Sequence, residues 1–346
     1  MARYDEGSRS IEGWGQTRLV IRGALVLATV CYSLVAPIAT RCAVIAALPQ
    51  FLPVAQVPKQ RDSQPKEDDT ARALLDRVGK PDQAVVETFK KAGMQDVKPH
   101  TLTSEERKAV EAALAALPAL NKRVLERHLH NLAFVDGIPG EGTGLTSPSK
   151  KTGLSDITLR ASVIDESLTT FLTNKERRVY KQDASGMTIT VAGTGTNALT
   201  YVLLHESTHV VDISCGITTT PGGPFVQSIW TDYSTLAPSL AVITPTTYFR
   251  GADHLPMAKA TSLYDALAQT PFVSLYATAS RQEDLAELVA WHEIYTQGGG
   301  DLTIELQDPG GKTIRQWHPL TFPKVRERFT EVDQLLSSQP GCASQS

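Results

Sequence analysis

Residues 203–212, LLHESTHVVD, place two histidines and a glutamate in an otherwise apolar stretch. His205 and His209 are four residues apart, so on a helix they project from one face, one turn apart. This spacing lets both imidazoles reach one Zn²⁺ at about 2.0–2.1 Å. Glu206 lies about 100° around the helix from His205, where it is not a natural third ligand but can take a proton from a metal-held water. The H-E-x-x-H pattern therefore predicts a zinc site with a glutamate general base.

The residues around this motif indicate a buried helix. YVLL precedes the first histidine and VV follows the second, and uncoordinated polar side chains in such a helix are costly. We expect the helix to run from about 197 to 213, with Thr196 or Asn197 as its N-cap. The alternative is that the three polar residues share a helix by chance.

A catalytic zinc usually has three protein ligands, and the sequence offers several candidates for the third. The histidine of the longer pattern H-E-x-x-H-x-x-G-x-x-H is absent, because Asp212 and Cys215 stand at the corresponding positions. Cys215 is a weak alternative. In SLYATASRQEDLAELVAW, residues 274–291, Glu283 and Glu287 are four apart and share a helix face. Glu283 can then bind the metal, while Glu287 or Asp212 hydrogen-bonds the second ring nitrogen of a histidine ligand.

Glu283 also has a purely structural interpretation. Ser280 precedes it by three residues, which is the spacing of a capping box. If Glu283 only closes the start of the helix, Glu287 becomes the metal ligand. Losing a cap costs about 1 kcal/mol, whereas losing a ligand empties the site.

Taken together, the two motifs resemble those of the gluzincin metallopeptidases, in particular the catalytic domains related to anthrax lethal factor. That group carries HExxHxxD on one helix and, on another, a tyrosine, six intervening residues and ExxxE; HESTHVVD and YATASRQEDLAE match this spacing. The resemblance covers only these two helices. It implies zinc-dependent hydrolysis of a protein or peptide, with the following roles: His205, His209 and Glu283 as zinc ligands, Glu206 as general base, and Tyr276 as hydrogen-bond donor to the oxyanion. Tyr276 has an alternative role as a half-buried aromatic residue with a satisfied hydroxyl.

The expected fold is α+β and zincin-like. A small twisted sheet lies beside the active-site helix, and a mainly helical second lobe carries Glu283. Residues 136–340 form this metallopeptidase domain. Residues 71–135 form a helical segment that packs on it, because TSEERKAVEAALAAL and PALNKRVLERHLHNL have apolar residues at three- and four-residue steps. The remaining predicted elements are a Gly/Ser/Pro loop over 137–153, strands over 156–164 and 187–193, a helix over 167–181, a hairpin around DPGGK at 308–312, and a closing helix from 323. Within the helix over 167–181, the charge pattern of NKERRVYK is typical of a solvated face.

The N-terminus has the pattern of a targeting segment. Two arginines precede GALVLATVCYSLVAPIA, residues 23–39, which carries no charge. A basic lead followed by a short apolar run is typical of a secretory signal or a membrane anchor. We therefore expect residues 1–48 to direct export of the protein, which is then periplasmic, secreted or anchored in the membrane by its N-terminus. Residues 49–70 are expected to form a flexible linker. The alternative is a buried helix of the main domain.

Composition restricts the class of partner. The chain has 346 residues, 41% of them apolar, and a formal net charge of −3, so it lacks the basic footprint of a nucleic-acid-binding protein. None of the four cysteines forms a C-x-x-C pair. Cys215 and Cys342 can pair if the protein is exported. Two other functions remain open: a non-catalytic, zinc-stabilised binding or structural protein, for which Glu206 would have no use, and a zinc amidase acting on cell-wall material.

Overall fold

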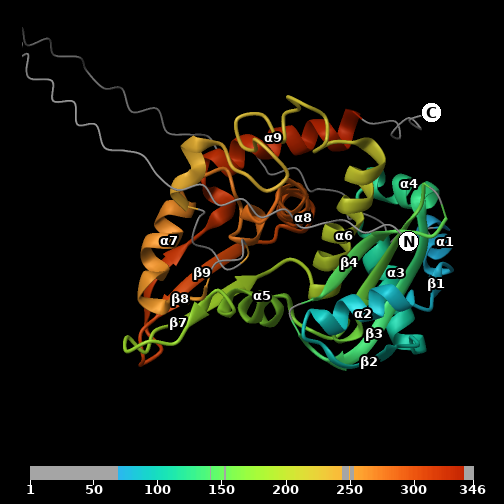
Figure 1. Cartoon of the computed structure of the whole chain (residues 1–346), viewed down its shortest axis with the longest axis horizontal. Helices are drawn as coiled ribbons and strands as arrows, with labels where there is room; N and C mark the ends of the chain where they lie inside the picture. The colour runs from blue at the N-terminus through green and yellow to red at the C-terminus, as the bar shows by residue number, and fades with distance from the viewer. Residues whose placement is uncertain (1–68, 141, 152, 244–248, 250–252, 339–346) are drawn as a thin grey trace, which may run out of the picture. The chain divides into compact units, whose positions relative to one another are not determined.

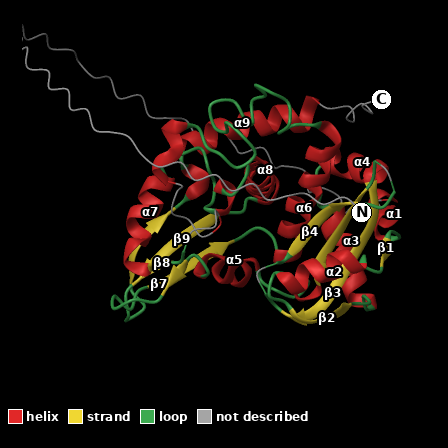
Figure 2. Ribbon diagram, viewed as in Figure 1, coloured by secondary structure: helices red, strands yellow, loops and turns green. Residues whose placement is uncertain are grey.

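The computed structural model describes residues 69–338, apart from 141, 152, 244–248 and 250–252. These residues all belong to one compact unit, Ser63–Ser346, and they form a mixed α+β fold (Figures 1 and 2). The segment predicted as signal or anchor, 1–48, lies outside the described residues. So does the predicted linker 49–70, apart from its last two residues, which begin α1 (Asp69–Leu75). Within the described part, none of the helices is both long and apolar enough to span a membrane.

The first sheet lies in the N-terminal part of the described chain. Its strand order is β1 (Val78–Gly79), β3 (Leu129–Ile138), β5 (Ser155–Arg160) and β4 (Gly144–Pro148), and β2 (Gln95–Pro99) also pairs with β3. β3 and β5 are parallel, with Leu132 opposite Ile157. β4 is antiparallel to β5, with Gly144 opposite Leu159. β4 therefore stands at the edge of the sheet, and this strand also contacts helix α6 (Ala198–Cys215).

Two sequence predictions fail in this region. Residues 71–135 are not entirely helical, because β1, β2 and most of β3 lie within them. In β3 the run Leu132 to Val135 is fully buried, as is typical of a central parallel strand covered on both faces. The predicted loop 137–153 contains β4, whose residues GLTSP are half-exposed. An edge strand exposes one side to water and needs no apolar pattern.

The second sheet is antiparallel, with the order β10 (Thr313–Trp317), β9 (Leu302–Gln307) and β7 (Thr188–Gly193). It confirms the predicted strand at 187–193 and the predicted hairpin around DPGGK. Helix α5 (Leu168–Arg177) packs on β7 and confirms the first part of the helix expected over 167–181. The end of that prediction is wrong, because Tyr180–Lys181 form a short strand.

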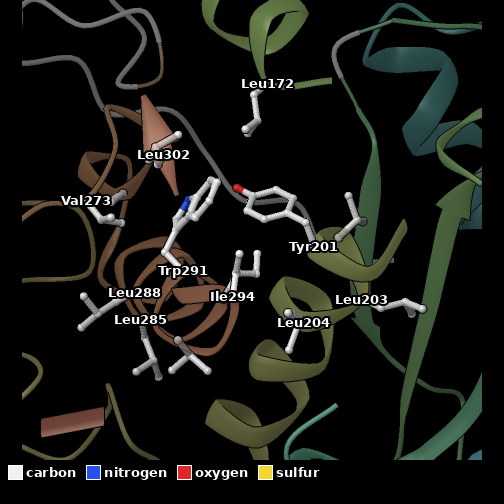
Figure 3. Packing of buried hydrophobic residues seen from close by; sticks show 14 of the residues in the cluster. Leu172, Tyr201, Leu203, Leu204, Val273, Leu285, Leu288, Trp291, Ile294 and Leu302 are labelled. Atoms are coloured by element: carbon white, nitrogen blue, oxygen red, sulfur yellow. The ribbon is translucent and has the colours of Figure 1, made fainter. Parts of the chain in front are cut away.

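Helices α6 and α8 (Arg281–Gly298) pack against each other and carry both motifs. Asn197 caps α6 by accepting a hydrogen bond from the backbone of Thr200 at 2.9 Å. The helix ends at Gly216, whose φ of +65° closes the last turn at little cost for a glycine. In Figure 3, Tyr201 of α6 points toward Trp291 of α8, and their ring centroids are 5.4 Å apart. Both side chains are fully buried, so this contact fixes the distance between the two helices.

The other helices complete the unit. α3 (Ser104–Ala115) and α4 (Ala119–His128) pack on α6, so the helical part of the N-terminal segment does contact the helix that carries HESTH. The remaining long elements are α2 (Gln83–Lys91), α7 (Ala260–Leu267) and α9 (Pro323–Ser338), with short strands β6 (Tyr180–Lys181) and β8 (Leu255–Pro256) paired in parallel.

Candidate metal centre

The two histidines of α6 lie side by side, as their four-residue spacing predicts. Their Nε2 atoms are 3.2 Å apart, and their ring centroids are 4.8 Å apart with the planes nearly perpendicular. His205 is buried, and His209 is slightly more exposed. Each ring therefore presents its Nε2 atom to the same small volume beside the helix.

Glu283, in the first turn of α8, brings the third donor atom. Its Oε2 atom is 2.9 Å from Nε2 of His205 and 3.5 Å from Nε2 of His209. Donor atoms at 2.0–2.1 Å from a tetrahedral Zn²⁺ are about 3.3 Å apart. The triangle of His205, His209 and Glu283 has edges close to this length, so its three donor atoms are near enough to one another to hold a metal ion.

The cap of α8 bears on the choice between Glu283 and Glu287. Ser280 is the N-cap, and its Oγ accepts a hydrogen bond from the backbone N–H of Glu283 at 3.3 Å. The carboxylate of Glu283 contacts the two histidines. Glu283 therefore takes part in the cap through its backbone, which leaves its side chain available as a donor to a metal.

Glu287 lies behind His205, one turn along α8 from Glu283. Its Oε1 atom is 3.3 Å from Nδ1 of His205 and also accepts a hydrogen bond from the Tyr201 hydroxyl. Oε2 accepts one from Ser274 at 2.7 Å. Burial alone would raise the pKa of Glu287, but Lys175 and His205 lower it to about 2. The ionised and almost fully buried carboxylate of Glu287 thus lies next to Nδ1 of His205. The sequence analysis predicted a carboxylate at this second ring nitrogen.

The same two carboxylates act on the charge of His205. Burial lowers the pKa of its ring, but the hydrogen bonds and negative charges of Glu283 and Glu287 raise the pKa to about 10. The pKa of Glu283 is held well below 4.5, since the charges of His209 and His205 outweigh its burial. The two carboxylates thus favour a positive charge at the position of the His205 ring.

Lys175 of α5 is a member of this site that the sequence analysis missed. Its ammonium nitrogen lies 3.4 Å from Glu287 and 3.5 Å from the centre of the Tyr276 ring, and only 14% of its side chain is exposed. The predicted solvated face of NKERRVYK is therefore wrong at this position. Phe171, four residues before Lys175 on α5, is buried, and so is Val179, four residues after it and just beyond the end of the helix. This spacing is the pattern that could have identified Lys175.

Tyr276 lies on the other side of the cluster, in the short 3-10 helix Tyr276–Thr278 that precedes α8. Its ring centroid is 5.8 Å from that of His205. Burial, together with the negative charges of Glu283 and Glu206, raises the pKa of its hydroxyl well above 10. The hydroxyl therefore keeps its proton at neutral pH and can donate it in a hydrogen bond.

The carboxylate of Glu206 contacts the edge strand β4. Its Oε2 accepts a hydrogen bond from Thr146 at 2.7 Å. Gly144 lies so close that a Cβ atom there would be 2.3 Å from Oε1 of Glu206. These two β4 residues fix the carboxylate, and the sequence analysis missed both because it placed them in a loop.

Two further positions of the motif have local roles in the structure. Asp212, predicted to support a histidine, accepts hydrogen bonds at 2.7 Å from both the backbone and the hydroxyl of Thr218, so it organises the turn after α6. Cys215, the weak alternative for a ligand, is disulfide-bonded. The other three cysteines, Cys342 among them, lie outside the described residues.

Comparison with models of protein families, with curated proteins and with solved structures found no match for this chain. The resemblance to gluzincins therefore rests on the two motifs alone.

Proposed function

We propose that this protein is a zinc-dependent hydrolase of peptide bonds, with a zincin-like arrangement of its edge strand and motif helix. One observation carries the proposal. Three donor atoms from two helices, on His205, His209 and Glu283, lie 2.9 to 3.5 Å apart, which is the separation that tetrahedral zinc requires. When bound, zinc would supply a water of lowered pKa and a Lewis acid for the scissile carbonyl.

The residues around the triangle support hydrolysis over a purely structural role. Glu206 is held by Thr146 beside the metal ligands without being one of them. A carboxylate in this position takes a proton from the attacking water and passes it to the leaving amine. The protonated hydroxyl of Tyr276 donates to the oxygen on which negative charge develops. A structural zinc site needs neither group.

The edge strand β4 supports a peptide as substrate. β4 pairs with β5 on one side and ends the strand order of its sheet, so no other strand of the described residues pairs with its second side. An extended peptide can add to such an edge through main-chain hydrogen bonds. Because Gly144 and Thr146 of β4 contact Glu206, a peptide bound there passes the candidate general base.

The proposal is tested by zinc content and hydrolysis on the full chain. We expect one zinc per chain by elemental analysis and cleavage of unstructured proteins such as casein. Glu206→Gln should keep the zinc and lose turnover, Glu283→Gln should lose the zinc, and Glu327→Gln, an exposed position on α9, should change neither. Absence of zinc from the wild type after exposure to the metal contradicts the site. Zinc without cleavage of protein indicates a structural protein, and cleavage of peptidoglycan fragments alone indicates a cell-wall amidase.

We further propose that the protein is exported. The apolar run near the N-terminus supports this, and so does the disulfide at Cys215, because disulfides persist in oxidising compartments. Fractionation of the producing cells with N-terminal sequencing of the chain tests it. A reduced, uncleaved chain in the cytosol would be the contrary result.

A further inference from the structure

Lys175 is a mostly buried cation beside the candidate metal centre. It lies on α5, and only 14% of its side chain is exposed. Lysine is seldom buried unless it is paired. Within the described chain its ammonium group forms an ion pair with one carboxylate, that of Glu287 at 3.4 Å. The proposed hydrolysis does not use Lys175 as an acid, a base or a ligand.

The second contact of the ammonium group is the ring of Tyr276. The nitrogen is 3.5 Å from the ring centroid, so it stands over the face of the ring, where the ring quadrupole attracts a cation. Lys175, Tyr276 and Glu287 line a cavity of about 20 Å³, which has room for about one water molecule. The ammonium group therefore has little space in which to move off the ring.

Ser274 binds the same carboxylate and fixes the backbone next to Tyr276. Its hydroxyl donates to Oε2 of Glu287 at 2.7 Å and accepts from the backbone N–H of Ala277 at 3.0 Å. Oε1 of Glu287 pairs with Lys175. Glu287 thus holds the segment of Tyr276 in two ways, through Ser274 at the backbone and through Lys175 at the ring.

The ring needs its own support because rotation about the Cα–Cβ bond of a tyrosine swings its hydroxyl through a wide arc. A donor to a developing oxyanion acts only from a narrow range of positions. A misplacement of about 1 Å can cost about 100-fold in rate. A cation held over the ring face opposes this rotation.

We propose that Lys175 is a positioning residue for Tyr276, whose ring it holds so that the hydroxyl faces the oxygen of the scissile carbonyl. The inference rests on the proposed hydrolysis and names a further residue of that site. It gives Lys175 a task separate from that of Glu287, whose contact with the metal ligands is to His205.

The first test compares the hydrolysis of casein by variants of the full chain with zinc bound. Lys175→Met should lower kcat by about tenfold and leave KM within about twofold, because the hydroxyl remains but is less well oriented. Lys175→Arg keeps a cation that stacks on the ring and should restore most of kcat. Lys181→Met removes an exposed lysine just after α5, and it should change neither value.

A double substitution shows whether Lys175 acts through the Tyr276 hydroxyl. In the Tyr276→Phe background, Lys175→Met should change kcat by less than about twofold, because the group that it orients is already gone. Loss by the same factor in both backgrounds, or loss of zinc from Lys175→Met, would assign Lys175 to the support of His205 through Glu287. Either result overturns the proposal, and so does a wild-type kcat in Lys175→Met.

Fluorine NMR of the zinc-free full chain labelled with 3-fluorotyrosine gives a readout that requires no turnover. The resonance of Tyr276 is identified by its loss in Tyr276→Phe. We expect it to be narrow in the wild type and in Lys175→Arg, and broadened or split in Lys175→Met, since the ring then adopts more than one orientation. An equally narrow resonance in Lys175→Met would contradict the proposed hold on the ring.

The two readouts separate this inference from the proposed function. Absence of cleavage by the wild type refutes the hydrolysis, whereas the fluorine spectrum still decides whether Lys175 holds the ring. Circular dichroism verifies the fold of each variant. Lys175→Gln, which keeps an N–H donor for Glu287, replaces Lys175→Met if that variant does not fold.

Discussion

The titration of Glu176 should be visible in the stability of the protein. This residue lies on α5 next to Lys175 and accepts a hydrogen bond from the hydroxyl of Tyr264. Burial raises its pKa from 4.5 to about 7. Because the folded chain holds this proton more tightly than the unfolded chain does, the protonated acid stabilises the fold at low pH. This stabilisation falls as the pH rises from 4.5 through 7 and then levels off.

The pKa difference corresponds to a total of about 3 kcal/mol, of which about 2 to 3 kcal/mol is lost between about pH 5 and pH 8. Glu176→Gln keeps an oxygen that can accept from Tyr264 and removes the titration. The free energy of unfolding, measured by urea denaturation with a chelator present, should therefore decrease more steeply with pH in the wild type than in Glu176→Gln. Glu327→Gln, at an exposed glutamate, should follow the wild type.

Equal pH dependence of the wild type and Glu176→Gln would refute this reasoning. It would mean that Glu176 is ionised in the folded protein at neutral pH, with the ammonium group of Lys175 compensating its charge. In that case Lys175 could not be assigned to Glu287 and Tyr276 alone.

Three other substitutions test the site and its support. Tyr276→Phe should lower kcat for the proposed hydrolysis by about 100-fold with zinc content unchanged; an unaltered rate would end its assignment as an oxyanion donor. Gly144→Ala should lower kcat by at least about tenfold without loss of zinc, since the new methyl group displaces Glu206; full activity would show that Glu206 has room to adjust. Arg328→Met should destabilise the fold by about 3–5 kcal/mol, because it leaves the buried Asp284 without its counter-charge at 2.7 Å and with only the hydrogen bond from Trp230; urea denaturation measures this loss, and a change below about 1 kcal/mol would show that Asp284 is neutral.

The helices that carry the site could be predicted because their information is local. Asn197 and Ser280 are cap residues at the positions where α6 and α8 begin, and spacing alone puts two histidines on one face. That Glu283 comes to these histidines depends on how α8 packs on α6, so only the resemblance pointed to it. The structure places these donors together.

The missed parts depend on partners distant in the sequence. β4 has no apolar alternation, and it is a strand because it pairs with β5 and packs beside α6. Its contacts with Glu206 could not be inferred from GLTSP. Asp212 was predicted to support a histidine because it lies three residues after His209, on the same face of the predicted helix. α6 continues to Cys215, and the turn that follows brings Thr218 to its carboxylate.

Glu287 joins parts of the chain that are far apart in sequence. Side chains from α5, α6 and the segment before α8 meet on its two oxygens, at a point where only 2% of the Glu287 side chain is exposed. Glu287 therefore links α8, the helix that carries Glu283, to α6, the helix that carries the histidines. Local opening that separates them must break these hydrogen bonds and the ion pair with Lys175, which is costly. The backbone amides of the two helices should then exchange with solvent as one cooperative unit, and the triangle of donor atoms should persist until that unit opens as a whole.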